Sequence, residues 1–303
     1  MTDPPRGPIP PDGRYPYSPI VGRPAGRWPG GKKLAVYVAL GVESYRFGEG
    51  HTEDLLTGVP APDLVNTSWR DYGNRVGAFR VLDRLARHAI PPTVLLNTDL
   101  YDTAPDIVIA ARTGGAEIVG HGRSNSDSLE GLAPEAERAY LDAVAARIAD
   151  KEGERPGGWS SPWLTHTRNT PDLLAETGYR YVLDLRLDDQ PVWLATTSTP
   201  LMSIPYALEL NDSSSIIGRG VSAGDFAAMV VDEFDELLEA AADQPLVMSI
   251  VVHSFISGVP FRLKHFTRAL RHLTDHGEDA WFTQPRDIYR AFAAISPPTI
   301  DSR

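Results

Sequence analysis

From residue 33 onward, short apolar runs alternate with longer segments in which apolar residues recur at helical spacing. The run 33–40 is apolar at nearly every position, which is typical of a strand that is covered on both faces. Further strands are expected at 93–97, 117–120, 181–183, 202–204 and 246–252. Helices are expected at 135–150 and 223–242, and around two apolar series, Val76, Phe79, Leu82, Leu85 and Leu263, Phe266, Leu270, Leu273. Strands that alternate with helices predict an α/β fold with a parallel sheet.

The length and the composition favour one large domain. With 303 residues, of which 42% are hydrophobic, the chain can bury a core large enough for a single α/β barrel. Residues 1–31 are rich in proline and glycine, so they are expected to form an extended arm on a surface. The predicted organisation is an arm at 1–31, a barrel domain at 32–296 and a short tail at 297–303.

Charge and hydropathy limit the partners. A formal net charge of −11 disfavours nucleic acid, because its binding proteins concentrate lysine and arginine on one face. The first residues lack the apolar run of a signal peptide and no stretch is long enough to span a bilayer, so a cytoplasmic protein with no membrane partner is expected. The absence of cysteine excludes disulfides and thiolate metal sites.

Several expected strands run directly into polar residues that could carry chemistry. These residues are Glu43, His121, Asp184 with Asp188 and Asp189, and His253. Taken singly, each is more typical of a helix cap or a hydrogen-bonded surface group. Because the carboxyl ends of parallel barrel strands converge on one mouth, their joint placement predicts a site there.

A series of short motifs resembles one protein family. The motifs are Arg14-Tyr-Pro-Tyr-Ser-Pro-Ile20, Trp28-Pro-Gly-Gly31, Trp69-Arg-Asp-Tyr-Gly-Asn-Arg75, Gly120-His-Gly122, Asp188-Asp-Gln-Pro191, Pro205-Tyr206, Asn211-Asp212, and His253 with Gly258 and Pro260-Phe-Arg262. Their order and spacing resemble the NodB-like polysaccharide deacetylases, in the branch that includes the cofactor-free bacterial allantoinase. The resemblance implies a distorted (β/α)7-type barrel and amidohydrolase chemistry, but it does not fix the substrate.

The same resemblance bears on a metal site. In the metal-dependent deacetylases the first motif is a pair of aspartates, a base and a metal ligand, and these positions are Glu43 and Ser44 here. The second motif supplies two histidines, and here it reads His121 and Asn125. One good ligand of the usual three remains, so no bound metal and no other cofactor are expected. The alternative is a zinc ion held by Glu43, His121 and His253.

Without a metal, acid and base side chains have to carry the reaction. Glu43 is the expected general base toward water. His253, at the position where the family keeps its acid, is expected to protonate the departing nitrogen. The oxyanion would then accept hydrogen bonds from His121, Asn125 or Arg75.

Ten residues are candidate contacts to a substrate: Arg70, Arg75, Asn125, Ser160, Trp163, Asp188, Asp189, Tyr206, Glu209 and Asn211. Ser160 stands where the third motif of the family normally carries an arginine. Structural alternatives stay open for several of them. Arg70 and Arg75 with Asp71 would suit an ion-paired helix start, the two aspartates a turn, and the aromatic residues the core.

The predicted function is hydrolysis of a non-peptide carbon–nitrogen bond in a small polar molecule, such as a cyclic amide, a ureide or an N-acyl group. Two alternatives stay open: a metal-dependent deacetylase of a polysaccharide or N-acetyl sugar, and a non-catalytic binding descendant of the fold. A homo-oligomer, dimer or tetramer, is expected from the resemblance and from the apolar groups of the arm, which are Tyr15, Tyr17, Ile20, Val21 and Trp28.

Overall fold

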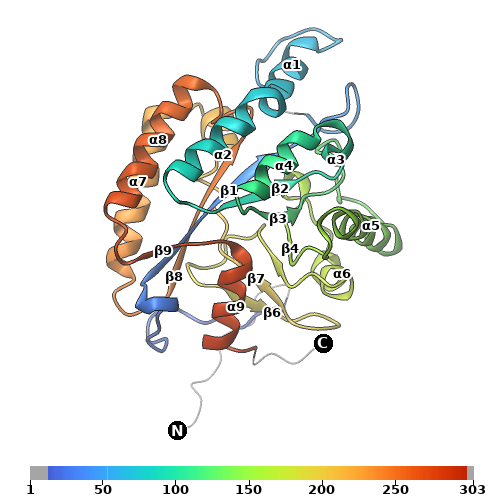
Figure 1. The fold of residues 1–303 in the computed structure, drawn as a ribbon. Coiled ribbons are helices and arrows are strands. Elements are labelled where there is room, and N and C mark those ends of the chain that lie inside the picture. Colours follow the sequence, from blue (N-terminus) through green and yellow to red (C-terminus); the bar gives the residue numbers. More distant parts are fainter. Residues whose placement is uncertain (1–12, 53, 299–303) are drawn as a thin grey trace.

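The computed structural model describes residues 13–52 and 54–298, and within them nine strands form one sheet (Figure 1). The strands are β1 (Leu34–Val42), β2 (Pro92–Leu96), β3 (Glu117–Gly120), β4 (Gly158–Trp159), β5 (Tyr181–Val182), β6 (Val192–Leu194), β7 (Leu201–Ser203), β8 (Leu246–His253) and β9 (Ala280–Phe282). Their order is β6-β7-β5-β4-β3-β2-β1-β8, with β9 added to β1. Only β6 runs antiparallel to its neighbour among these strands.

Helices surround this sheet (Figure 1). They are α1 (Leu64–Tyr72), α2 (Ala78–Arg87), α3 (Leu100–Thr103), α4 (Pro105–Thr113), α5 (Pro134–Glu152), α6 (Thr170–Glu176), α7 (Ala223–Ala240), α8 (Pro260–Asp275) and α9 (Pro285–Ile295). Short 3-10 or π turns are η1 (Pro29–Gly31), η2 (Gly73–Gly77), η3 (Pro162–Leu164) and η4 (Ser213–Gly218). The alternation of strand and helix is the one that the sequence predicts for parallel strands.

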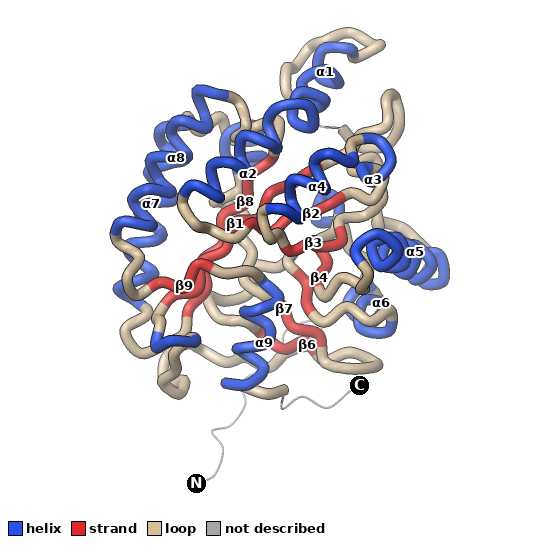
Figure 2. The backbone as a smooth tube through the Cα atoms, viewed as in Figure 1, coloured by secondary structure: helices blue, strands red, loops and turns tan. Residues whose placement is uncertain are grey.

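The sheet curls into a partly closed barrel (Figure 2). After β7 at one end of the sheet, the chain returns toward β8 at the other end, where Asn211 forms a parallel bridge with Val251. The predicted α/β fold, a distorted barrel of mostly parallel strands, is confirmed. The closure also brings the segment after β7 beside the carboxyl end of β8, which matters for the site below.

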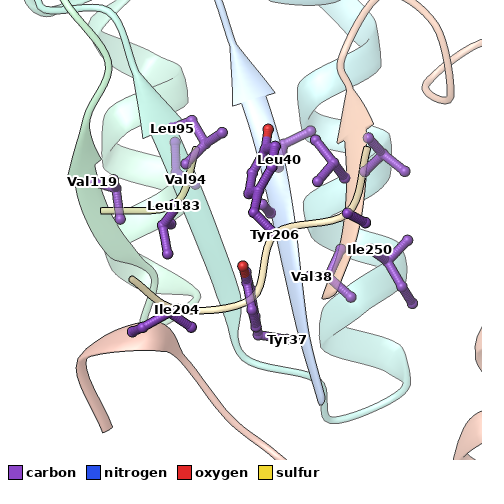
Figure 3. Packing of buried hydrophobic residues seen from close by; sticks show 14 of the residues in the cluster. Tyr37, Val38, Leu40, Val94, Leu95, Val119, Leu183, Ile204, Tyr206 and Ile250 are labelled. Atoms are coloured by element: carbon purple, nitrogen blue, oxygen red, sulfur yellow. The ribbon is translucent and has the colours of Figure 1, made fainter. Parts of the chain in front are cut away.

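The core includes residues of the sheet, of the surrounding helices and of the segment that crosses the inner face of the sheet, and Figure 3 shows part of it. Every residue of β1 is buried, as expected for a strand with cover on both faces. Figure 3 shows two tyrosines in this core, Tyr37 from β1 and Tyr206 from the crossing segment. The Tyr37 hydroxyl donates to the Pro205 carbonyl at 2.7 Å, so the crossing segment is fixed to β1.

The strands predicted from the sequence are present with their ends shifted by at most two residues. The sequence prediction omitted β4, β6 and β9. Each of these strands has only two or three residues, and a segment this short offers little pattern with which to distinguish a strand from a turn, although the equally short β5 and β7 were predicted.

The described part of the arm packs against the body. Arg14 pairs with Asp172 at 2.6 Å, Arg23 pairs with Asp188 at 2.5 Å, and the buried Trp28 indole donates to the Leu246 carbonyl at 2.7 Å. Residues 1–12 of the predicted arm and 299–303 of the predicted tail lie outside the described residues. Among the helices that the structure describes, none is both long and apolar enough to cross a membrane.

The carboxyl group of Glu117 is buried at the start of β3. It accepts the Arg286 N–H at 2.9 Å and lies against the Tyr181 hydroxyl. Burial raises the pKa of Glu117 to about 8, from an ordinary value of 4.5. Between these values the folded chain binds a proton that the unfolded chain has released. The free energy of unfolding should therefore fall as the pH rises through this window.

We expect Glu117→Gln to weaken this pH dependence, because glutamine does not titrate. Urea unfolding at about pH 5 and about pH 8 should show the unmodified chain losing at least about 1 kcal/mol more than the variant between the two conditions. The exposed Glu154→Gln, near the same position, is the control and should behave as the unmodified chain does. Equal pH dependence in both variants would contradict the assignment.

Candidate active site

Three titratable side chains converge at the carboxyl ends of β1, β3 and β8. Glu43 directly follows β1, His121 directly follows β3, and His253 is the last residue of β8. Oε1 of Glu43 lies 3.3 Å from Nε2 of His253 and 3.6 Å from Nε2 of His121. Glu43 is 4% exposed, His121 5% and His253 9%. The structure thus brings together the three groups that the sequence nominated for catalysis.

The pairing of β1 with β8 explains this approach. In the parallel register Gly41 lies opposite His253, and Glu43 follows two residues later on the same side of the strand. A Cβ atom at Gly41 would lie 2.7 Å from the His253 ring. Glycine at this position therefore makes room for the imidazole beside β1.

Asp212 orients His253. Its side chain is fully buried, and its Oδ1 lies 2.6 Å from Nδ1 of His253. The carboxylate also accepts the backbone N–H of His253 at 2.9 Å and both the N–H and the hydroxyl of Ser257. Because a carboxylate accepts hydrogen bonds, Nδ1 carries the proton toward Asp212, and Nε2 is the ring atom that faces Glu43.

His121 is oriented in a similar way by a backbone group. Its Nδ1 lies 2.8 Å from the Ser160 carbonyl, which can only accept, so Nδ1 is a donor and Nε2 faces Glu43. Ser160 follows β4 and is fully buried. The residue therefore contributes its carbonyl to the site, and its hydroxyl has no hydrogen-bond partner among the described residues.

The electrostatics favour a carboxylate beside an imidazolium. Burial alone would raise the pKa of Glu43, but the charges and hydrogen bonds of His253 and His121 hold this pKa well below its usual range. Burial alone would lower the pKa of His253, yet Glu43 and Asp212 together raise it well above its ordinary value. At neutral pH Glu43 is therefore a carboxylate and His253 an imidazolium, which are the protonation states that a general base and a general acid would need.

Tyr45 and Asn125 complete the polar cluster. The Tyr45 hydroxyl donates to Oε2 of Glu43 at 2.6 Å, so Oε1 remains the atom that faces the two imidazoles. Asn97 donates to Oδ1 of Asn125 at 3.1 Å, which fixes the amide so that its Nδ2 points to the Tyr45 hydroxyl at 3.4 Å. Asn74 donates to the backbone carbonyl of Glu43 at 2.7 Å.

Aromatic side chains enclose this cluster. The Tyr45 ring makes edge contacts with Trp163 and Phe255, at centroid distances of 6.4 Å and 6.1 Å. The Trp163 indole donates to the Asn125 carbonyl at 2.5 Å. The Arg70 guanidinium, in the last turn of α1, lies 4.8 Å from the Tyr45 ring centroid. A helix start is therefore the wrong alternative for Arg70, which belongs to the wall of the site.

Asp188 and Asp189 do not lie at this mouth, and their prediction as substrate contacts is wrong. The Asp189 carbonyl accepts the N–H of Val247 near the amino end of β8. Six residues of strand, about 20 Å, separate that position from His253. Asp188 pairs with Arg23 of the arm instead. Both follow β5 in sequence, but the chain has already turned back to the opposite end of the barrel.

The other predicted contacts fall into two groups. Arg75 and Glu209 have exposed side chains, and Glu209 pairs with Arg219 at 3.1 Å, so neither belongs to the cluster. Asn211 accepts the Ser213 N–H at 3.0 Å and acts as a turn residue beside Asp212. Tyr206 lies in the core beneath the site, where burial raises its pKa well above its usual range and keeps its hydroxyl neutral.

Asp212 and Tyr45, whose side chains bond to the side chains of His253 and Glu43, are absent from the sequence prediction. Asp212 belongs to the Asn211-Asp212 motif, yet nothing local to it indicates an imidazole 41 residues later. Tyr45 lies two residues after Glu43, a spacing that puts alternate residues of an extended chain on one side. That spacing was the sequence signal that could have placed Tyr45 beside Glu43.

The donor set does not fit a metal ion of the kind that the deacetylase motifs hold. Ser44 occupies the ligand position after Glu43, and its backbone groups bond to Asn97, Ser124 and Asn125. Asn125, at the second histidine position, is engaged by Asn97. In the part of the chain that the structure describes, no group of three His, Cys, Asp or Glu side chains is arranged to hold a metal ion.

Comparisons with known proteins agree with the fold and the motifs. Residues 69–182 match the polysaccharide deacetylase family. A protein of Schizosaccharomyces pombe that is described as a polysaccharide deacetylase is 26% identical to this chain, and the match covers 89% of this chain and 93% of that protein.

Two crystal structures resemble the fold. The PuuE allantoinase structure has 28% identity and a TM-score of 0.83, with 98% of this chain and 100% of that chain covered. A Pseudomonas aeruginosa PAO1 protein described as a polysaccharide deacetylase has 27% identity and a TM-score of 0.78, with 91% and 96% covered. Both are similar over nearly the whole length, so the likeness extends beyond the region that the family matches.

Proposed function

We propose that this chain, whose residues 69–182 match the polysaccharide deacetylase family, hydrolyses a carbon–nitrogen bond in a small polar amide without a bound metal. The observation that carries the proposal is the approach of two imidazole Nε2 atoms to one oxygen of Glu43, at 3.3 Å and 3.6 Å. A base, an acid and a carboxylate that orients the acid supply the proton transfers that amide hydrolysis requires.

In the proposed reaction, Oε1 of Glu43 takes a proton from water as the water oxygen bonds to the amide carbon. The carbon–nitrogen bond of the tetrahedral intermediate then breaks, and Nε2 of His253 gives its proton to the leaving nitrogen. Glu43 is now protonated and His253 is neutral. Since these two atoms lie 3.3 Å apart, the proton can return from Oε1 to Nε2 and restore the starting pair. Each proton-transfer role typically contributes on the order of 10² to 10⁴ in rate.

Without a metal ion to act as a Lewis acid, the oxyanion of the tetrahedral intermediate needs a hydrogen-bond donor. We assign this role to Nδ2 of Asn125, because Asn97 holds the opposite end of its amide group. His121 can donate through Nε2 only when it is an imidazolium, since its Nδ1 proton is already given to Ser160. Arg75, the third candidate from the sequence, is exposed and is withdrawn from this role.

Enclosure of the cluster supports a small substrate rather than a polymer. Glu43, His121 and His253 are each less than 10% exposed, and the rings of Tyr45, Trp163 and Phe255 surround them. The similarity to an allantoinase over the whole length supports cyclic ureides and related amides as the class to test first. The alternative is a metal-dependent deacetylase of N-acetyl sugars, which the family match supports.

We propose further that the protein works in the cytoplasm as a homo-oligomer. The described arm leaves Tyr17 and Val21 exposed, at 58% and 85%, and Ile295 of α9 is exposed near the groove that the arm lines. These apolar groups would be covered in a dimer or tetramer. A solution mass equal to one chain would contradict the oligomer.

One experiment separates the candidate functions. Protein purified without added metal is analysed for zinc and assayed on cyclic ureides, imides, formamides and N-acetyl sugars, each with and without a chelator. We expect turnover of an amide in the first three classes, by protein that contains far less than one zinc per chain and keeps its activity in chelator. Stoichiometric zinc whose removal abolishes turnover would support the metal-dependent alternative. Folded protein that is inactive on every class would support a binding descendant.

Tyr45→Phe tests how Glu43 is positioned. Removal of the hydroxyl takes away the hydrogen bond to Oε2, so the carboxylate should rotate more freely and its pKa should rise. We expect kcat to fall by about tenfold and the acidic limb of the kcat/KM profile to move to higher pH. Tyr140→Phe, which removes a hydroxyl on α5, is the control. An unchanged pH profile would show that Tyr45 only fills space.

A further inference from the structure

A groove between α2 and α8 is lined by five basic side chains. It has a volume of about 530 Å³, and its polar walls are Arg80 and Arg84 from α2 and Lys264, Arg268 and Arg271 from α8. Figures 1 and 2 show the two helices next to each other on the outside of the barrel. Pro260, Leu263 and Thr267 complete the lining. This concentration of positive charge occurs in a chain whose formal net charge is −11.

The spacing of these residues makes two facing rows. Arg80 and Arg84 are four residues apart on one helix, while Lys264, Arg268 and Arg271 are four and then three residues apart on the other. Side chains at these spacings share one face of a helix. Each row therefore presents its charges to the other row across the groove.

These cations lack carboxylate partners. Across residues 13–52 and 54–298, no acidic side chain forms an ion pair with any of the five, whereas arginines on other helices do pair, such as Arg112, Arg138 and Arg147. The two helices carry one acidic residue each, Asp83 and Asp275, and Asp83 pairs with Arg87 outside the groove.

Two details indicate that the positive charges of the groove are not neutralised within the chain. Nε of Arg84 is buried and has no hydrogen-bond partner among the described residues, although buried polar groups are normally satisfied. Arg80 donates to the Tyr72 hydroxyl at 2.5 Å, which is a neutral acceptor and leaves its positive charge uncompensated. Five like charges around one concave surface repel one another, so an anion in the groove would lower the energy of the folded chain.

The local potential has an effect on a neighbouring group. Burial lowers the pKa of His88, and Arg271 and Arg84 lower it further, while Asp275 opposes them. The shift has the direction that a positive surface produces.

We propose that this groove binds a small polyphosphate anion, either free triphosphate or the triphosphate group of a nucleotide. Four of the five cations are arginines, whose planar forks match phosphate oxygens in pairs. The groove has the size of a small-molecule site rather than of an extended protein interface. The site lies on the outer helices and uses none of the residues assigned to hydrolysis, so it stands independently of the proposed reaction.

Calorimetric titration of the full chain with sodium triphosphate tests this proposal. We expect binding at about 20 mM salt that weakens by tenfold or more at about 200 mM salt, because screening acts on exposed charges. Inorganic monophosphate should bind at least about tenfold more weakly, since it engages fewer cations. A nucleoside triphosphate with equal affinity would show that phosphate alone is recognised, and a tighter one would show that the nucleoside adds contacts; both support the proposal.

Two double variants with equal charge give the decisive comparison. Arg268→Gln with Arg271→Gln removes two exposed cations from the groove, and we expect an affinity loss of about 10²-fold, roughly tenfold for each cation. Arg138→Gln with Arg147→Gln removes two cations from α5 and should change the affinity less than about threefold. If the double variant unfolds, the exposed Lys264→Gln gives an independent measurement of how the loss of one groove cation changes the affinity for triphosphate.

Three results would overturn the proposal. One is equal affinity in the two double variants. Another is no heat and no thermal shift with triphosphate at low salt. The third is binding of a polyglutamate peptide in the absence of triphosphate binding, which would assign the groove to an acidic protein partner instead.

Discussion

Replacing Glu43 by glutamine will lower kcat for amide hydrolysis by about 10²- to 10⁴-fold while the chain remains folded. Glutamine keeps an oxygen that can accept the Tyr45 hydroxyl proton, but it cannot take a proton from water. The change also removes the negative charge beside His253, so the pKa of the imidazole should fall toward its ordinary value. Steady-state kinetics and circular dichroism measure the two parts of this result.

The matched control for this variant is Glu49→Gln. Glu49 lies six residues further along the same connection, and its exposed side chain contacts Arg46 at 3.8 Å. The same chemical change at this position should leave kcat within about twofold, because surface substitutions rarely disturb a site. A Glu43→Gln enzyme whose kcat lies within tenfold of the unmodified value would exclude Glu43 as the base.

Replacing Asp212 by asparagine will have the second large effect. Asp212 accepts hydrogen bonds from Nδ1 and the backbone of His253 and from Ser257, and an amide would turn an N–H toward some of these donors. His253 would lose both its orientation and a charge that raises its pKa. We expect kcat to fall by about 10²- to 10⁴-fold, as when an orienting carboxylate is replaced in a catalytic triad. The alkaline limb of the pH profile should move to lower pH.

The melting temperature and the pH profile together distinguish a residue that positions His253 from one that only stabilises the fold. Removing one partner of a buried charged pair costs about 3–5 kcal/mol, so the Asp212→Asn chain should also unfold more easily. Asp172→Asn breaks the ion pair with Arg14 near the arm and serves as the control. It should lower the melting temperature without moving the pH profile. A Asp212→Asn enzyme with an unchanged alkaline limb would contradict the role assigned to Asp212.

The sequence anticipated the framework of the site because the relevant signals are local. An apolar run marks a buried strand, and the polar residue that ends the run lies at the carboxyl end of that strand. Glu43 after β1, His121 after β3 and His253 at the end of β8 all follow this rule. Parallel strands then bring their carboxyl ends to one mouth, so their proximity did not require knowledge of any loop.

The same rule failed for Asp188 and Asp189 because it assumes that polar residues after a strand stay at the mouth. Strand β5 has two residues, and the chain beyond it returns toward the amino end of β8 before β6 begins. No periodicity records the direction of such a connection. Asp188 instead pairs with Arg23 of the arm, and Asp189 pairs with Arg186.

By itself the sequence determined the parallel α/β framework and the placement of Glu43 and His253 at its mouth, because burial on both faces of a strand produces a run of consecutive apolar residues. Only the tertiary structure decided how the barrel closes. That closure sets Asp212 against His253, turns Asp188 away, and lays α2 beside α8 so that two modest rows of cations become one groove. Contacts of this kind depend on loop paths and on curvature of the sheet, which are properties of the whole packed chain and leave no local pattern to detect.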